Sequence, residues 1–162
     1  MVQPMKKLIY IEENFITPEE CQQFIDFAVD NKNETPHGNG DTYSTKVDWK
    51  NHTAIYFGGN VDSTVPSLDN VIVNRVVDIC KSFDPKANLD YVGVVRWPVG
   101  TFMKPHVDDN NVHKPDMFAA MLYLNDDFEG GNTVFHDLVV KPEVGKLIIF
   151  SNSQYLHYVS KV

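Results

Sequence analysis

The second half of the chain is a succession of short β-like runs separated by turn signals. Residues rich in Gly, Pro, Asn and Asp at 98–100, 125–131 and 142–145 interrupt the runs. The runs are Tyr91–Trp97, Phe102–Val107, Met117–Leu124, Thr133–Phe135, Leu138–Val140, Lys146–Phe150 and Tyr155–Val159. This spacing favours an all-β sandwich or jelly roll over βαβ units, which need a helix between consecutive strands.

The first half has a helical character. Thr17 can cap a helix whose first position is Pro18 and whose third is Glu20, and the apolar stripe of that helix ends near 30–31. A second amphipathic helix is predicted over Pro66–Phe83, with Ser67 as its candidate cap. Short strands are predicted at 7–11 and 53–57. The expected fold class is therefore mainly β with two flanking helices, an α+β arrangement.

Length and charge limit the function further. A chain of 162 residues fits one domain, with helical support over about 1–85 and a β core over about 86–162. Its 14 basic and 22 acidic residues give a net charge of −8, which argues against a nucleic-acid partner. Two cysteines without a paired framework indicate a reduced cytoplasmic protein, and no segment resembles a signal peptide or a membrane span.

Residues 33–51 form a polar stretch without sustained periodicity. Loops of this length in compact domains are lids, binding loops or unstructured segments, and the functional and structural interpretations are equally supported. Tyr43 and Trp49 are the large apolar residues of the stretch. If the loop closes over a substrate, these two side chains are the ones expected to contact it.

The chemistry centres on His106, Asp108 and His157. Side chains two apart in a strand share a face, with α-carbons about 6.6 Å apart, so His106 and Asp108 can converge on one ion. A third ligand from a distant strand would complete a set of two histidines and one carboxylate, which is associated with non-haem Fe(II). His157 is the candidate and His136 its main competitor. His37, His52 and His113 have no such spacing.

Four ordered motifs resemble the 2-oxoglutarate and Fe(II)-dependent oxygenases, in particular the prolyl 4-hydroxylase-like branch. They are Val94–Gly100 followed by Pro105–Asp108, then Ala120–Asn125, the Gly-Gly-x-Thr-x-Phe turn within Glu129–Phe135, and the segment from Pro142 through Phe150 that leads to His157. The match covers about residues 89–159.

The resemblance implies a double-stranded β-helix that holds Fe(II) through His106, Asp108 and His157. It implies 2-oxoglutarate and O2 as co-substrates, succinate and CO2 as co-products, and ascorbate as a further candidate cofactor. The implied reaction is hydroxylation of a substrate, with a prolyl residue of a peptide or protein as the first candidate.

The resemblance also assigns residues to the co-substrate pocket. Tyr123 matches a tyrosine that donates a hydrogen bond to the far carboxylate of 2-oxoglutarate. Trp97 and Met103 stand where tyrosines are common and would line the pocket, and Thr133 of the glycine turn is a further cofactor-binding candidate.

Relatives place a basic residue after the distal histidine to pair with that carboxylate, whereas five residues follow His157 here. We therefore expect either a truncated chain or a substitute cation. Lys104 and Lys161 share strand parity with His106 and His157, and Arg96 and Lys146 are weaker candidates.

Two other functions are compatible with the sequence. A cupin-like metal enzyme that does not use 2-oxoglutarate would explain the missing cation. A non-catalytic β-helix that only binds a partner would explain both the missing cation and the altered pocket aromatics, although packing alone does not require three converging ligand-type side chains.

Overall fold

The computed structural model describes residues 8–30, 54–56, 67–89, 93–95, 97, 99–100, 102–108, 118–151 and 154–162. The loop of residues 33–51, with Tyr43 and Trp49, lies outside the described residues. No helix within the described ranges is both long enough and apolar enough to span a membrane.

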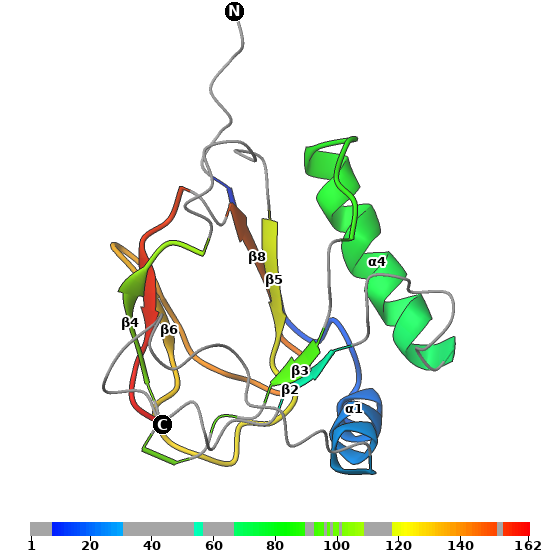
Figure 1. The fold of residues 1–162 in the computed structure, drawn as a ribbon, viewed down its shortest axis with the longest axis horizontal. Coiled ribbons are helices and arrows are strands. Elements are labelled where there is room, and N and C mark those ends of the chain that lie inside the picture. Colours follow the sequence, from blue (N-terminus) through cyan, green and yellow to red (C-terminus); the bar gives the residue numbers. More distant parts are fainter. Residues whose placement is uncertain are drawn as a thin grey trace, which may run out of the picture.

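The described strands form three antiparallel sheets (Figure 1). A three-stranded sheet has the order β1-β8-β5, a four-stranded sheet the order β4-β9-β6-β7, and a small sheet pairs β2 with β3. Their bounds are β1 Ile9–Glu12, β2 Ala54–Tyr56, β3 Gly93–Val95, β4 Met103–His106, β5 Phe118–Leu122, β6 Thr133–Phe135, β7 Val139–Val140, β8 Leu147–Ser151 and β9 His157–Val159. Each lies within or overlaps a predicted β run, so the strand predictions are confirmed.

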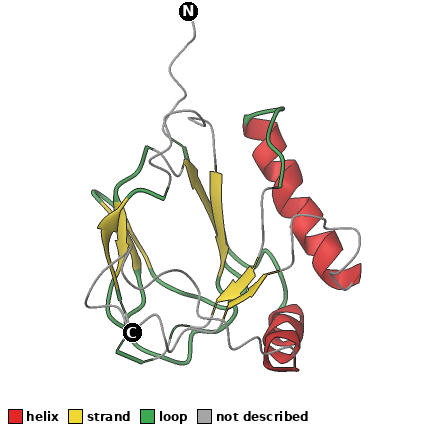
Figure 2. Cartoon of the chain, in the orientation of Figure 1, coloured by secondary structure: helices red, strands yellow, loops and turns green. Residues whose placement is uncertain are grey.

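Two helices pack on one side of the three-stranded sheet, and the four-stranded sheet lies on its other side (Figure 2). Helix α1 spans Pro18–Asp30 and helix α4 spans Ser67–Phe83. The predicted capping box of α1 forms: Glu20 N–H donates to Thr17 Oγ1 at 3.2 Å, and Thr17 N–H donates to the Glu20 carboxylate at 2.9 Å. The predicted β core with two flanking helices is confirmed.

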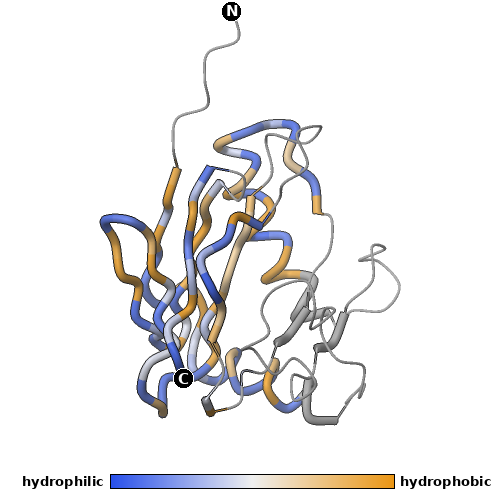
Figure 3. Tube along the Cα trace, turned by 60° about the vertical axis from the view of Figure 1, so that its left-hand side comes forward, coloured by the Kyte–Doolittle hydropathy of each residue, from blue (hydrophilic) through white to orange (hydrophobic). Residues whose placement is uncertain are grey.

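Strand β8 supplies both faces of the core. Leu147 and Ile149 pack with α1 and α4, whereas Ile148 and Phe150 pack between the two larger sheets, and all four are fully buried. Figure 3 shows that hydrophobic and hydrophilic stretches both occur along the β part of the chain. Burying each of the four β8 side chains contributes about 1.5–3 kcal/mol. Strand β8 therefore anchors both the helices and the four-stranded sheet.

The turn before β8 is held against the start of α1 by Gly145. Its carbonyl oxygen accepts the Phe15 N–H at 2.8 Å, and its φ is +79°. A β-carbon at this position would lie 2.2 Å from the carbonyl oxygen of Ile16. Glycine is therefore needed both for the left-handed backbone and for the close approach of the two segments.

We expect Gly145→Ala to lower the free energy of unfolding by about 2 kcal/mol more than Gly100→Ala, as measured by urea denaturation. Gly100 is a matched control because its φ is +91° but nothing lies within 4 Å of the added carbon. Equal losses in the two variants would show that backbone strain alone, and not the contact with Ile16, makes the glycine necessary.

Candidate metal centre

Three ligand-type side chains meet where β4 and β9 pair. His106, the last residue of β4, lies directly opposite His157, the first residue of β9. Their ring centroids are 4.4 Å apart, and Asp108 lies two residues beyond His106. One ligand atom from each of the three side chains lies within 4.8 Å of the others. The predicted His106, Asp108 and His157 set is therefore brought together by the fold.

Both imidazoles are fixed by backbone carbonyls two residues earlier in the chain. Nδ1 of His106 lies 2.7 Å from the Lys104 oxygen, and Nδ1 of His157 lies 3.1 Å from the Tyr155 oxygen. A carbonyl only accepts, so each Nδ1 carries the proton and each Nε2 is left as the ligand atom. The two Nε2 atoms lie 3.0 Å and 3.4 Å from Oδ1 of Asp108.

This arrangement fits a bound cation. In the neutral tautomer, two imidazole lone pairs converge on a carboxylate, which is unfavourable unless a proton or a metal ion lies among them. Two nitrogens and one oxygen on one side of an ion are the donors that suit a non-haem Fe(II) site with open positions. The donor set therefore fits Fe(II).

The electrostatics of the cluster also favour a cation. Burial works to raise the pKa of Asp108, but hydrogen bonds from His106 and His157 in their protonated form outweigh burial and hold the pKa at about 2. For His106, burial works to lower the pKa, and the hydrogen bonds to Asp108 and to the Lys104 carbonyl outweigh it, so the pKa is raised. Asp108 is thus ionised at neutral pH, beside two imidazoles.

Aromatic rings support the buried side of the cluster. The His157 side chain is 5% exposed, against 17% for His106 and 32% for Asp108. The ring of Phe150 meets the His157 ring edge-on at 4.7 Å, and the Phe135 ring lies 5.7 Å away. The cluster is closed on the His157 side and opens to solvent on the Asp108 side.

A β-bulge in β4 places His106 in this register. Met103 pairs with Val159 and His106 pairs with His157, so Lys104 and Pro105 together face the single residue Tyr158. Proline cannot donate to a strand ladder and is found at bulges, which is the signal in the sequence for this irregularity. The Lys104 carbonyl, which orients His106, was not predicted from the sequence, because every residue has a backbone carbonyl and the residue type does not mark this one.

The bulge also overturns the prediction that strand alternation directs Lys104 inward. The extra residue interrupts the alternation, and Lys104 is exposed. Lys161 is exposed as well, and Lys146 is buried but paired with Glu143 at 2.7 Å and with Glu13 at 3.3 Å. Among the lysines and arginines whose side chains the structure describes, every one except Lys146 is exposed. Arg96 lies outside the described residues.

Two of the candidate co-substrate residues, Met103 and Thr133, lie in the four-stranded sheet, one row of cross-strand partners away from the metal ligands. Met103, Val159 and Thr133 are cross-strand partners in one row, next to the row of His106, His157 and Phe135. Successive residues on one face of a strand are about 6.6 Å apart, so this is the spacing of the two rows.

The Tyr123 hydroxyl lies 2.6 Å from Oγ1 of Thr133, which is 2% exposed. Burial raises the pKa of Tyr123, and the hydrogen bond to Thr133 works against that rise. Two hydroxyl groups therefore face the interior beside the metal ligands. Trp97 and Met103 are both half-buried.

His136 does not belong to the cluster. Its side chain is 94% exposed at the turn after β6, and its Nδ1 lies 2.5 Å from Asp137. The ligand set of the described residues contains His157 in its place. His37, His52 and His113 lie outside the described residues.

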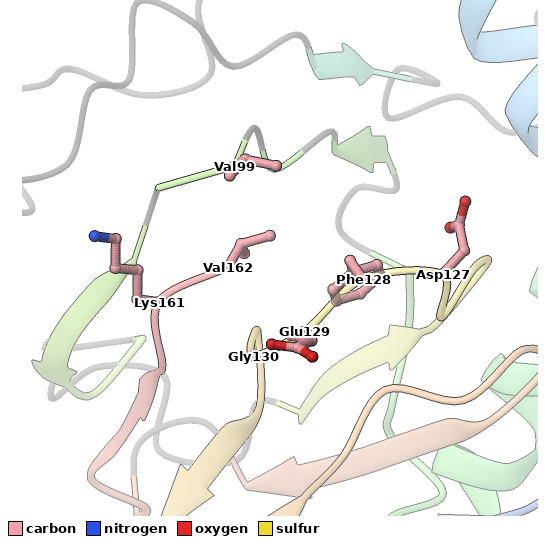
Figure 4. Close-up of a pocket in the computed structure, with 7 residues that line it drawn as sticks. All are labelled: Val99, Asp127, Phe128, Glu129, Gly130, Lys161 and Val162. Carbon is pink, nitrogen blue, oxygen red and sulfur yellow. The ribbon is translucent and has the colours of Figure 1, made fainter.

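An open cavity of about 590 Å³ lies at the end of the chain, lined by Val99, Asp127, Phe128, Glu129, Gly130, Lys161 and Val162 (Figure 4). None of the metal-ligand candidates lines it. The Lys161 ammonium points away from Phe128. A β-carbon on Gly130 would lie 1.8 Å from the Lys161 carbonyl oxygen, so the predicted glycine turn packs directly against the C-terminal residues.

Residues 92–162 match the family model described as the 2OG-Fe(II) oxygenase superfamily. This segment contains His106, Asp108 and His157. The three ligand-type residues therefore lie within the segment that is similar to that superfamily. The resemblance inferred from the motifs is therefore confirmed.

One curated relative is a probable prolyl 4-hydroxylase 8 of Arabidopsis thaliana, 29% identical over 142 residues. The match covers 78% of this chain and 44% of the relative, so the chain spans less than half of that protein.

Solved structures share the fold. A prolyl 4-hydroxylase of Pseudomonas putida superposes with a TM-score of 0.73 at 15% identity, covering 96% of this chain and 86% of that chain. A viral collagen prolyl hydroxylase of Paramecium Bursaria Chlorella virus-1, in complex with 2OG, gives a TM-score of 0.67 at 18% identity and covers 94% and 88%.

A third structure is a prolyl hydroxylase from Trichoplax adhaerens, in complex with a peptide fragment of the hypoxia inducible factor oxygen degradation domain. It gives a TM-score of 0.66 at 16% identity and covers 94% and 77%. These likenesses confirm the jelly-roll, double-stranded β-helix core.

We expect His106→Ala to weaken Co(II) or Fe(II) binding by at least about 100-fold, because one of three protein ligands and its hydrogen bonds are lost. Anaerobic titration followed by the visible spectrum of Co(II) measures this. His136→Ala removes an exposed histidine and should leave the affinity unchanged. A comparable loss in both variants would contradict the ligand assignment.

The depressed pKa of Asp108 predicts a pH-dependent contribution to stability in the metal-free protein. The contribution is present above the ordinary pKa of 3.8 and is lost as the pH falls toward about 2. It amounts to at most about 2 kcal/mol, and less where solvent screens the partly exposed carboxylate.

Urea denaturation at a series of pH values, with chelator present, should show Asp108→Asn less stable than the native chain at pH 5. The difference should shrink toward pH 2. A difference that stays constant over this range would contradict the assigned pKa.

Proposed function

We propose that this protein is an Fe(II)- and 2-oxoglutarate-dependent dioxygenase that hydroxylates a prolyl residue of a peptide or protein, with succinate and CO2 as co-products. The observation that carries the proposal is the convergence of His106, Asp108 and His157, with both histidines oriented through Nδ1. The match of residues 92–162 to the model of the 2OG-Fe(II) oxygenase superfamily supports the same activity.

The three ligand side chains would hold Fe(II) through the two Nε2 atoms and the Asp108 carboxylate. When bound, Fe(II) supplies the activation of O2, coupled to decarboxylation of 2-oxoglutarate. The charge of Asp108 offsets part of the charge of the ion, and the Lys104 and Tyr155 carbonyls keep the imidazoles in the ligating tautomer. Phe150 and Phe135 exclude water from the His157 side.

The hydroxyl pair of Tyr123 and Thr133 would bind the far carboxylate of 2-oxoglutarate. The pair lies one row from the metal ligands, and about 6.6 Å between rows suits a short dicarboxylate whose other end is at the ion. A phenol and an alcohol both donate to a carboxylate once their mutual bond rearranges. Met103 lies in the same row, and Trp97 and Met103 would line the pocket.

A second candidate function is favoured by one specific observation. Among the lysines and arginines whose side chains the structure describes, Lys146 is the only buried one. It is already paired with Glu13 and Glu143. A buried carboxylate without a cation is costly. A cupin-like metal enzyme that uses the same three ligands without 2-oxoglutarate would need no such cation.

The proposed substrate class rests on the relatives. The Trichoplax adhaerens structure contains a peptide bound to a prolyl hydroxylase, and the viral structure is that of a collagen prolyl hydroxylase. Prolyl peptides are therefore the first substrates to test, with ascorbate included as the reductant that the family resemblance suggested. The expected products are succinate and a hydroxylated peptide, formed only with both Fe(II) and O2 present.

Anaerobic addition of Fe(II) and 2-oxoglutarate should give a visible metal-to-ligand charge-transfer band. We expect Tyr123→Phe to raise the dissociation constant of 2-oxoglutarate by about tenfold or more, because a hydrogen bond to a charged group is lost, and to leave Fe(II) affinity unchanged. Tyr10→Phe also loses a tyrosine hydrogen bond, to Glu12 in the helix-side packing, and serves as the control.

Fe(II) binding without the band, and without succinate formation, would contradict the proposal and favour the cupin-like enzyme. Absence of any turnover by an iron-loaded chain that binds 2-oxoglutarate would favour the non-catalytic β-helix.

A further inference from the structure

Among the strand pairs of the described residues, only β4 and β9 shift their register. Met103 pairs with Val159 and His106 pairs with His157, so β4 carries one extra residue between the two pairs. Met103 and His106 are half-buried, whereas Lys104 and Pro105 between them are exposed. The extra residue therefore brings Met103 and His106 to the same face of the sheet.

A regular ladder would move His106 out of the site. If the pairing continued without a shift from Met103 and Val159, Lys104 would pair with Tyr158 and Pro105 would pair with His157. Strand alternation would then direct Pro105 inward beside His157 and His106 outward. The register shift is therefore a condition for the two imidazole rings to meet, with their centroids 4.4 Å apart.

Pro105 is the residue of this stretch whose chemistry opposes the regular ladder. Proline has no N–H to donate to a partner strand, and within sheets it is confined to edge strands, first strand positions and bulges. Because Pro105 is exposed, its ring is not held by core packing. The effect of proline at this position is therefore on the backbone.

Pro105 also restricts the peptide group that orients His106. The Lys104 carbonyl oxygen, which lies 2.7 Å from Nδ1 of His106, belongs to the peptide between Lys104 and Pro105. The proline ring holds its own φ at about −65° and disfavours a helical backbone at the residue before it. Rotation of this peptide group is therefore limited on both of its sides. An alanine at this position would remove both limits and would add an N–H group.

We propose that Pro105 is a positioning residue of the metal centre. It keeps the bulge in β4, and through the Lys104 carbonyl it keeps the ring proton of His106 on Nδ1, so that Nε2 is left for the ion. The inference rests on the proposed function, which makes His106 a ligand of Fe(II). His157 is oriented instead by the Tyr155 carbonyl, at 3.1 Å and outside the bulge. Pro105 therefore acts on one of the two histidines.

Co(II) titration of the full chain, followed by the visible spectrum, is the first measurement. We expect Pro105→Ala to weaken Co(II) binding about tenfold or more, as is typical when a group that orients a metal ligand is lost. Pro105→Gly frees the backbone further and should lose at least as much affinity. Pro85→Ala is the matched control, because Pro85 is also exposed and lies in the turn after α4, where the Ala87 N–H donates to the Asp84 carbonyl at 2.9 Å. This control should keep the native affinity.

The ring tautomers are the second measurement, and a general loosening of the fold would not move them selectively. NMR correlation spectra of the metal-free chain with isotope-labelled histidine, at a pH where the imidazoles are neutral, report which ring nitrogen carries the proton. In Pro105→Ala we expect His106 to gain a population protonated on Nε2, while His157 stays protonated on Nδ1. The signals of His106 are assigned by their loss in His106→Ala.

Four results would overturn the role of Pro105. The first is native Co(II) affinity in both Pro105→Ala and Pro105→Gly. The second is the same loss of affinity in Pro85→Ala. The third is a His106 tautomer that stays as in the native chain, or an equal change in both histidines. The fourth is loss of the thermal unfolding transition in both Pro105 variants, which would assign the proline to the stability of the sheet.

Failure of the proposed function gives a different result. A native chain whose Co(II) affinity is the same in His106→Ala would overturn the metal site itself, and with it the role of Pro105. Native affinity in Pro105→Ala, beside a strong loss in His106→Ala, would overturn the role of Pro105 and leave the metal site in place.

Discussion

The pairing of β4 with β9 is the interaction on which the site depends. It brings His106 and His157, which are far apart in the sequence, directly opposite each other, and it leaves Asp108 just beyond the end of the ladder. Residues directly opposite each other in an antiparallel pair point to the same face of the sheet, so both histidine side chains reach the interior. The bulge at Lys104 and Pro105 then sets which residue of β4 faces His157. A regular strand would carry the same residues with a different face directed inward.

The hydrophobic core gives this pairing its rigidity. β8 is fully buried, and its Phe150 ring packs against His157 while its other face holds the two helices. Displacing His157 would therefore disturb the packing between the two large sheets. The low exposure of His157 also keeps water away from its side of the cluster. Core packing and metal-site geometry are thus parts of one arrangement.

Sequence reasoning predicted the local elements well because their signals are local. The capping box of Thr17 and Glu20 formed as expected, and the strand of Thr133–Phe135 has the predicted bounds. The choice of His157 over His136 as the third histidine of the cluster also agrees with the structure, because only His157 lies opposite β4. The inward direction of Lys104 failed, since strand parity holds only while a strand is regular, and the bulge was not anticipated.

The fold class, the two helices, the candidate ligands and the resemblance that the family model confirms could all be predicted from the sequence, because periodicity, caps and motif order are local features of the chain. The ligating tautomer of both histidines and the 2.6 Å contact of Tyr123 with Thr133 can be seen only in the three-dimensional structure. The Lys104 carbonyl belongs to the bulge that sets the register of β4 against β9, and the Tyr123 contact joins the end of β5 to β6. Register follows from the packing of both sheets together, which no single segment specifies.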